Sequence, residues 1–241
     1  MTIDEILATL TLTEKVALLT GADYWHTKAF PEAGVDAIML TDGPHGLRKQ
    51  ADAADHLGLN AARPATCFPT PASLASTWDE ELVEEVGAAL GAEAAHEEVS
   101  VVLGPGANIK RDPRCGRNFE YYSEDPLLSG RIAAAMIRGI QSRGVAACLK
   151  HFAANNQETD RLRISADVDD RALREIYLAS FEEAIAGGHP RCVMSSYNRV
   201  NGTYAGESRT LLTDVLRDEW GFDGVVVSDW GAVFDRVATL R

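Results

Sequence analysis

The sequence predicts an α/β fold of βα units, as in a (β/α) barrel of the TIM type with about six of the eight units present. From about residue 36 onward, apolar runs typical of strands alternate with helical patterns. The ends of these runs recur about every 37 residues, and eight such units need about 300 residues, more than this chain of 241 offers. Polar side chains stand at the ends of several runs. An open six-stranded sheet would fit the same pattern.

Residues 2–20 are expected to form helices that precede the first strand. Thr11 and Glu14 have the spacing of a capping box, and Gly21 ends the helical pattern.

Six apolar runs are expected to form the strands. They are AIMLTD (37–42), ATCFPT (65–70), SVVLGP (100–105), VAACLKH (145–151), CVMSSY (192–197) and VVVSD (225–229). The second run contains Pro69, which has no N–H for a strand ladder and weakens that prediction.

Helices are expected between the strands, and three of them have a start signal. The signals are Thr77 with Glu80, Asp125 followed by Pro126, and Asp169 or Asp170. The last of these helices should stop at Gly187 and Gly188, where a left-handed residue can cap it.

Composition argues against several classes of partner. The 36 acidic and 23 basic residues give a net charge of −13, which repels phosphate backbones and anionic lipids, so neither nucleic acid nor membrane is expected as a partner. The uncharged stretch Ala65–Trp78 contains two prolines and is shorter than the roughly 20 apolar residues of a spanning helix. The N-terminus lacks the basic and apolar regions of a signal peptide, so a cytoplasmic location is expected.

No metal or cofactor is expected either. The four cysteines are widely spaced, with no C-x-x-C pair, which argues against both a zinc site and a disulfide framework. A metal-dependent barrel hydrolase would need several histidines at strand ends, where only His151 stands. The G-P-G at 104–106 does not match the dinucleotide-binding pattern of an oxidoreductase.

Polar residues gather where the expected strands end. They are Asp42, then Asn108 and Arg117, then Lys150 and His151, then Tyr197, then Asp229. In a parallel barrel these ends face one pocket, although acids such as Asp229 could simply cap the following helices. Lys150 and His151 end an apolar strand, where such groups need polar partners.

Five ordered runs carry a family resemblance across nearly the whole chain. They are LTDGPHGLR (40–48), DPRCGRNFEYYSEDP (112–126), KHFAANNQETDR (150–161), VMSSYNRVNG (193–202) and WGFDGVVVSDW (220–230). Together they resemble the N-terminal domain of family 3 glycoside hydrolases, the β-glucosidase group. The resemblance implies that residues 1–241 are the N-terminal portion of a catalytic barrel, with the downstream domains of the enzyme outside this chain.

What the resemblance implies chemically is a retaining enzyme that removes terminal β-D-glucosyl or similar residues through a covalent glycosyl-aspartate. Asp229, in the S-D-W run, matches the nucleophile. The arginines and lysine at neighbouring strand ends should favour its charged form.

The resemblance also assigns sugar-binding positions. Asp42 would accept hydrogen bonds from two sugar hydroxyls, and Lys150 and His151 would also bind hydroxyls. Hydroxyls would be fixed or carboxylates oriented by Arg48, Arg117 and Arg161. Tyr197 would hydrogen-bond near the nucleophile, and the pocket would be lined by Met194 and Trp230. Simpler roles stay open for three of them: Arg161 pairing only with Glu158 or Asp160, Met194 in the core, and Trp230 in packing.

Two departures narrow the expected function. Family members that cleave N-acetylglucosaminides carry an Asp and His pair in the loop after the K-H strand, and the loop at 152–161 has no histidine, which favours the glucosidase type. Glucosidase-type members hold their acid/base glutamate in a separate domain far downstream, so a downstream domain or a second chain is expected to supply it. Glu120 and Glu158 are the nearby carboxylates, and helix-start or ion-pair roles suit them better. The alternative is a non-catalytic or incomplete sugar-binding fragment that needs a second chain.

Overall fold

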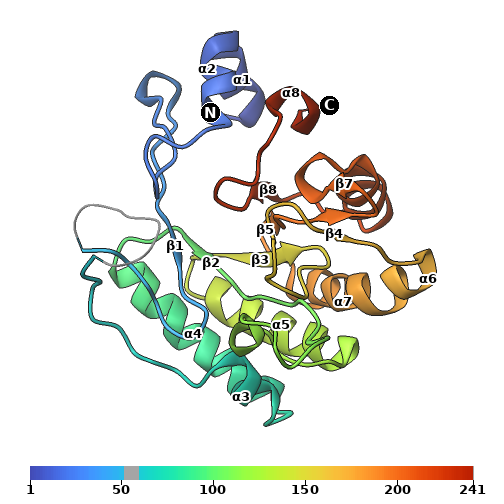
Figure 1. The fold of residues 1–241 in the computed structure, drawn as a ribbon. Helices are drawn as coiled ribbons and strands as arrows, with labels where there is room; N and C mark the ends of the chain where they lie inside the picture. Colours follow the sequence, from blue (N-terminus) through green and yellow to red (C-terminus); the bar gives the residue numbers. More distant parts are fainter. Residues whose placement is uncertain (52–59, 241) are drawn as a thin grey trace.

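The computed structural model describes residues 1–51 and 60–240. Its centre is a sheet of parallel strands, in the order β1 (Leu40–Asp42), β2 (Val101–Leu103), β3 (Ala146–Phe152), β5 (Cys192–Ser195) and β8 (Val225–Ser228). Figure 1 shows α4 (Glu80–His96), α5 (Pro126–Gln141) and α7 (Ala179–Gly188) gathered on one side of this sheet. The predicted α/β fold with a parallel sheet is confirmed, and the sheet has the form of a half-barrel.

The predicted strand over residues 65–70 is wrong. This segment is extended but joins no strand ladder, and most of it is exposed to solvent. Pro64 and Pro69 lack backbone donors, and the N–H of Phe68 bonds to the loop carbonyl of His45 instead. Within the described residues five strands therefore make up the sheet, and none of them lies between β1 and β2 in the chain.

The N-terminal helices form as predicted. They are α1 (Ile3–Thr9) and α2 (Leu12–Leu18), and each begins with a full capping box, at Thr2 and at Thr11. Neither helix buries a residue, so local capping rather than core packing defines them here.

The predicted helix starts are partly right. Asp125 caps α5 ahead of Pro126, and Asp169 caps the continuous helical stretch from α6 (Asp170–Ala172) through η3 (Leu173–Leu178) to α7. That stretch ends at a left-handed His189 rather than at a glycine. The prediction that Thr77 caps α4 is wrong, because Asp79 accepts from the Leu82 N–H while the Thr77 hydroxyl donates to a carbonyl.

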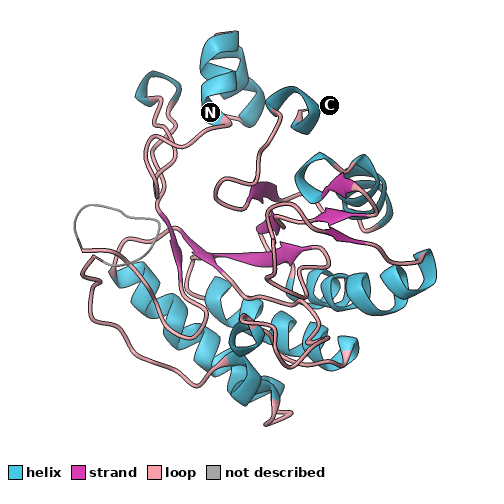
Figure 2. Cartoon of the chain, viewed as in Figure 1, coloured by secondary structure: helices cyan, strands magenta, loops and turns pink. Residues whose placement is uncertain are grey.

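The remaining elements surround this frame. They are η1 (Pro31–Ala33), α3 (Pro71–Ala75), η2 (Asn118–Glu120), a small sheet of β4 (Ser165–Ala166), β6 (Arg199–Val200) and β7 (Thr203–Tyr204), then η4 (Ala205–Glu207), η5 (Thr210–Glu219) and α8 (Arg236–Thr239). Figure 2 shows the strands of the sheet with helices gathered along one side of them. Among residues 1–51 and 60–240, no helix is both long and apolar enough to cross a membrane.

Two glycines let α4 and α5 approach closely. A Cβ atom at Gly87 would lie 2.7 Å from the carbonyl oxygen of Met136, and one at Gly139 would collide with the carbonyl oxygen of Glu84. Because the clashing atoms are backbone, neither neighbour can turn aside. This contact fixes the layer that supports β2 and β3.

Candidate active site

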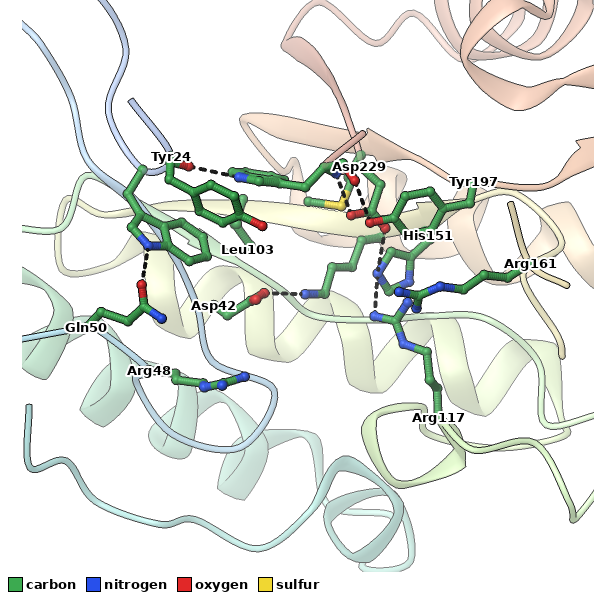
Figure 3. Close-up of a pocket in the computed structure, with 14 residues that line it drawn as sticks. Tyr24, Asp42, Arg48, Gln50, Leu103, Arg117, His151, Arg161, Tyr197 and Asp229 are labelled. Carbon is green, nitrogen blue, oxygen red and sulfur yellow. Dashed lines mark hydrogen bonds and ion pairs between the residues drawn. The ribbon is translucent and has the colours of Figure 1, made fainter. Parts of the chain in front are cut away.

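A cavity of about 170 Å³ opens at the carboxyl edge of the sheet (Figure 3). All ten residues singled out from the sequence line it: Asp42, Arg48, Arg117, Lys150, His151, Arg161, Met194, Tyr197, Asp229 and Trp230. Tyr24, Trp25, Gln50 and Leu103 complete the lining. In the described part of the chain, no group of three or more His, Cys, Asp or Glu could hold a metal ion.

Strand ends place the central groups. Asp42 is the last residue of β1, Lys150 and His151 lie near the end of β3, and Asp229 directly follows β8. Parallel strands present their carboxyl ends at one edge, which is why residues so distant in sequence meet here. Gly46 keeps the loop after β1 tight, because its φ of +147° is unsuited to a side chain and a Cβ would strike Thr66.

Lys150 and Asp42 form an ion pair within the cavity. Lys150 Nζ donates to Asp42 Oδ1 at 2.9 Å, and the lysine side chain is only 4% exposed. Burial opposes the charge on Asp42, but Lys150, Arg117 and Arg48 outweigh it and hold the pKa of Asp42 below its ordinary value. The Asp42 side chain remains 37% exposed, so the carboxylate can still accept hydrogen bonds from a ligand.

Asp229 has one oxygen held and one oxygen unpartnered. The Trp230 backbone N–H donates to Oδ1 at 2.8 Å, whereas Oδ2 is buried without a hydrogen-bond partner. Burial raises the pKa of Asp229 above its ordinary value despite the opposing effect of Lys150 and Arg117. The sequence predicted the opposite direction, because desolvation at this position cannot be read from neighbouring charges.

His151 is fixed on both its backbone and its ring. The Asn108 side chain accepts from the His151 N–H and donates to its carbonyl, each at 2.9 Å. On the ring, Arg117 Nη2 lies 2.8 Å from Nε2, and Nε2 lies 3.7 Å from Asp229 Oδ2. Burial, together with Arg117, Lys150 and Arg161, lowers the pKa of His151 well below its ordinary value, so the ring is neutral.

Arg161 and Tyr197 close one side of the cavity. The Arg161 guanidinium pairs with Glu158 at 2.9 Å and lies 4.7 Å from the centre of the Tyr197 ring. The Tyr197 hydroxyl donates to the Trp230 carbonyl at 2.8 Å, directly beside Asp229. Arg161 thus has the simple ion-pair role and also lines the cavity. Met194 likewise packs in the core and reaches the lining.

The two other carboxylates considered from the sequence lie outside the lining. Glu120 is buried against Arg117, and Glu158 pairs with Arg161. Both therefore have the ion-pair roles that the sequence favoured.

The N-terminal segment adds an aromatic wall that strand ends could not predict. The Trp230 indole N–H donates to the Tyr24 carbonyl at 2.8 Å, and the Trp25 ring lies 5.5 Å from the Trp230 ring. The Trp25 indole N–H donates to Gln50 at 2.9 Å. The only local signal is the pair of adjacent aromatic residues ahead of the first strand.

The half-barrel and the polar cavity at its strand ends define a domain of a (β/α) barrel enzyme. Residues 50–239 match the family model of the glycosyl hydrolase family 3 N-terminal domain. The chain belongs to this family.

Relatives agree in sequence and in structure. The chain is 59% identical over 238 residues to thermostable beta-glucosidase B of Acetivibrio thermocellus, covering 99% of this chain and 32% of that protein. It is 54% identical over 233 residues to an exo-alpha-(1->6)-L-arabinopyranosidase of Bifidobacterium longum, covering 96% and 31%. The structure of beta-glucosidase 3B from Thermotoga neapolitana in complex with glucose superposes with a TM-score of 0.92 at 47% identity, covering 98% of this chain and 35% of that one. The chain spans about a third of the length of these relatives.

Proposed function

We propose that this chain is the nucleophile-bearing part of a retaining glycosidase that removes terminal β-D-glucosyl or closely similar residues. The observation that carries the proposal is Asp229, a carboxylate that lines the cavity together with Asp42, Lys150 and arginines and whose Oδ2 accepts no hydrogen bond. The relatives named beta-glucosidase and arabinopyranosidase support a pyranosyl substrate.

The proposed reaction uses Asp229 as the covalent catalyst. Its Oδ2 attacks the anomeric carbon, the glycosidic C–O bond breaks, and the departing oxygen takes a proton from a general acid. Water then attacks the glycosyl-aspartate and passes its proton to the same group, which releases the sugar with retained configuration. The Trp230 N–H donates to Oδ1, so Oδ2, which accepts no hydrogen bond, is the oxygen proposed to attack.

The Asp42–Lys150 pair and Arg48 would bind those sugar hydroxyls that are remote from the bond that breaks. A buried lysine paired with a carboxylate presents donors and acceptors in fixed positions, which suits a ligand that carries several hydroxyls. Arg117 would add donors beside Asp229, and the His151 ring would hold the Arg117 guanidinium in place.

The general acid is proposed to come from a downstream domain or a second chain. A retaining enzyme needs two carboxyl groups about 5 to 5.5 Å apart. Glu120 and Glu158 are engaged by arginines and do not line the cavity. For that reason residues 1–241 by themselves are proposed to bind sugar without efficient turnover.

A mechanism-based label tests the nucleophile directly. The full-length enzyme is treated with a 2-deoxy-2-fluoro-β-D-glucosyl donor that carries a good leaving group, and the labelled peptide is mapped. We expect the label on Asp229, none in Asp229→Asn, and normal labelling in the surface control Asp214→Asn. A label on any other residue, or stable labelling of Asp229→Asn, would overturn the assignment.

A further inference from the structure

Two buried residues behind the cavity have no role in the proposed reaction. The Tyr121 hydroxyl lies 3.0 Å from His151 Nδ1, and the Asn155 amide lies 3.3 Å from the same hydroxyl. Tyr121 is fully buried and Asn155 is 1% exposed. The side-chain oxygen of Asn155 has no hydrogen-bond partner.

The position of the proton on the His151 ring follows from the Arg117 guanidinium, which contacts the other ring nitrogen. A guanidinium can only donate, so Arg117 at 2.8 Å requires a lone pair on His151 Nε2. The ring is neutral, so its one proton is then on Nδ1 and is donated to the Tyr121 oxygen.

The Tyr121 proton in turn needs an acceptor. Burial raises the pKa of Tyr121 well above its ordinary value, so the hydroxyl keeps its proton. A half-turn of the Asn155 amide brings its unpartnered oxygen to the hydroxyl, and the nitrogen and oxygen of an amide are interchangeable in shape. With that orientation the protons of Arg117, of the His151 ring and of the Tyr121 hydroxyl each have an acceptor, and the Asn155 amide nitrogen takes the place of the oxygen that has no partner.

We propose that Asn155 and Tyr121 form a hydrogen-bond relay that fixes His151 as the Nδ1-protonated neutral tautomer. In this tautomer Nε2 accepts from Arg117 and offers no proton to Asp229. The other tautomer would set an N–H against the Arg117 N–H and aim a donor at Asp229 Oδ2 from 3.7 Å. Tyr121 and Asn155 are thus positioning residues that keep the His151 ring from donating to Asp229 Oδ2, a consequence that rests on the proposed function.

The tautomer itself can be measured without any activity. In the full-length enzyme labelled with ¹⁵N-histidine, the ring signals of His151 are assigned by their loss in His151→Gln. We expect a protonated Nδ1 and an unprotonated Nε2. A proton on Nε2 in the unmodified enzyme would overturn the relay, whatever the outcome for the nucleophile.

Variants test the relay against simple packing. Tyr121→Phe removes the hydroxyl, and Asn155→Leu removes its acceptor. Tyr122→Phe is the matched control, because Tyr122 is adjacent, 2% exposed, and has a hydroxyl without a partner. Both relay variants should shift the His151 proton toward Nε2 and lower kcat about tenfold with little change in KM, while the control changes neither.

The relay would be overturned if folded Tyr121→Phe kept the His151 ring signals and the kcat of Tyr122→Phe. If the relay variants proved too unstable to purify, the tautomer of the unmodified enzyme would still decide the matter.

Discussion

Nζ of Lys150 lies 2.9 Å from Oδ1 of Asp42, so one ion pair joins β3 to β1 across the strand between them. Each charge is stabilised by the other, since burial acts against the ionised form of both and their attraction outweighs it. This pair gives the cavity a buried charged donor next to a charged acceptor.

Asp42→Ala should therefore weaken both sugar binding and rate. Loss of hydrogen bonds to a charged acceptor is expected to lower kcat/KM roughly 10- to 100-fold. Steady-state kinetics of the full-length enzyme on a β-glucoside would show it, with Asp36→Ala on the exposed segment before β1 as control. Unchanged kcat and KM would leave Asp42 as a structural ion-pair partner only.

Asp229→Asn should abolish turnover while the fold persists. The amide cannot attack the anomeric carbon, so kcat is expected to fall on the order of 10⁴-fold or more. Circular dichroism should match the unmodified enzyme. Activity near that of the unmodified enzyme would reject Asp229 as the nucleophile.

The same substitution should stabilise the fold near neutral pH. Because the folded state raises the pKa of Asp229, ionisation costs the folded state more than the unfolded one. This loss of folding free energy is absent when the pH is below the ordinary pKa of 3.8. It grows as the pH rises from 3.8 through the folded-state pKa and is constant above it. Thermal unfolding should therefore give a higher Tm for Asp229→Asn at neutral pH and no difference in strong acid.

Asp42→Asn should change the Tm at neutral pH in the opposite direction. Its pKa is lowered in the fold, so the ionised form stabilises the protein above the ordinary pKa and that stability is lost in acid. This variant should lower Tm at neutral pH. An equal response of the two variants would contradict the assigned charge environments.

Gly139→Ala should destabilise the helical layer. The added methyl would meet the backbone of α4, and overpacking of this kind typically costs about 1–3 kcal/mol. Gly116→Ala is the control, since a Cβ there meets nothing within 4 Å. Chemical denaturation compares the two, and equal midpoints would show that α4 and α5 can separate without cost.

Residues 1–241 expressed alone should associate and hydrolyse β-glucosides negligibly. The sheet ends at β1 and β8, and Val225 on β8 is 65% exposed. Sedimentation and turnover assays, repeated after addition of the downstream segment, would test this. A cooperative monomer with full turnover would place the general acid within this chain.

The sequence predicted the site better than it predicted the sheet. Polar residues at strand ends led to the cavity because parallel topology brings such ends together wherever each strand begins. The run at 65–70 failed because its apolar pattern carried no information about its exposed position. Trp25 and Gln50 were missed since only the tertiary fold brings their segments to the strand ends.

The hydrogen bond from Trp230 to the Tyr24 carbonyl spans 206 positions and sets an order of events during synthesis. At about 5–20 residues per second, Tyr24 leaves the ribosome roughly 10 to 40 s before Trp230 does. During that interval Tyr24 and Trp25 lack their contacts with Trp230, so their rings can be reached by chaperones or by other nascent chains. Asp229 precedes Trp230 directly, so the carboxylate and the contact that completes the wall leave the ribosome together, and the cavity is assembled in the same step that covers these rings.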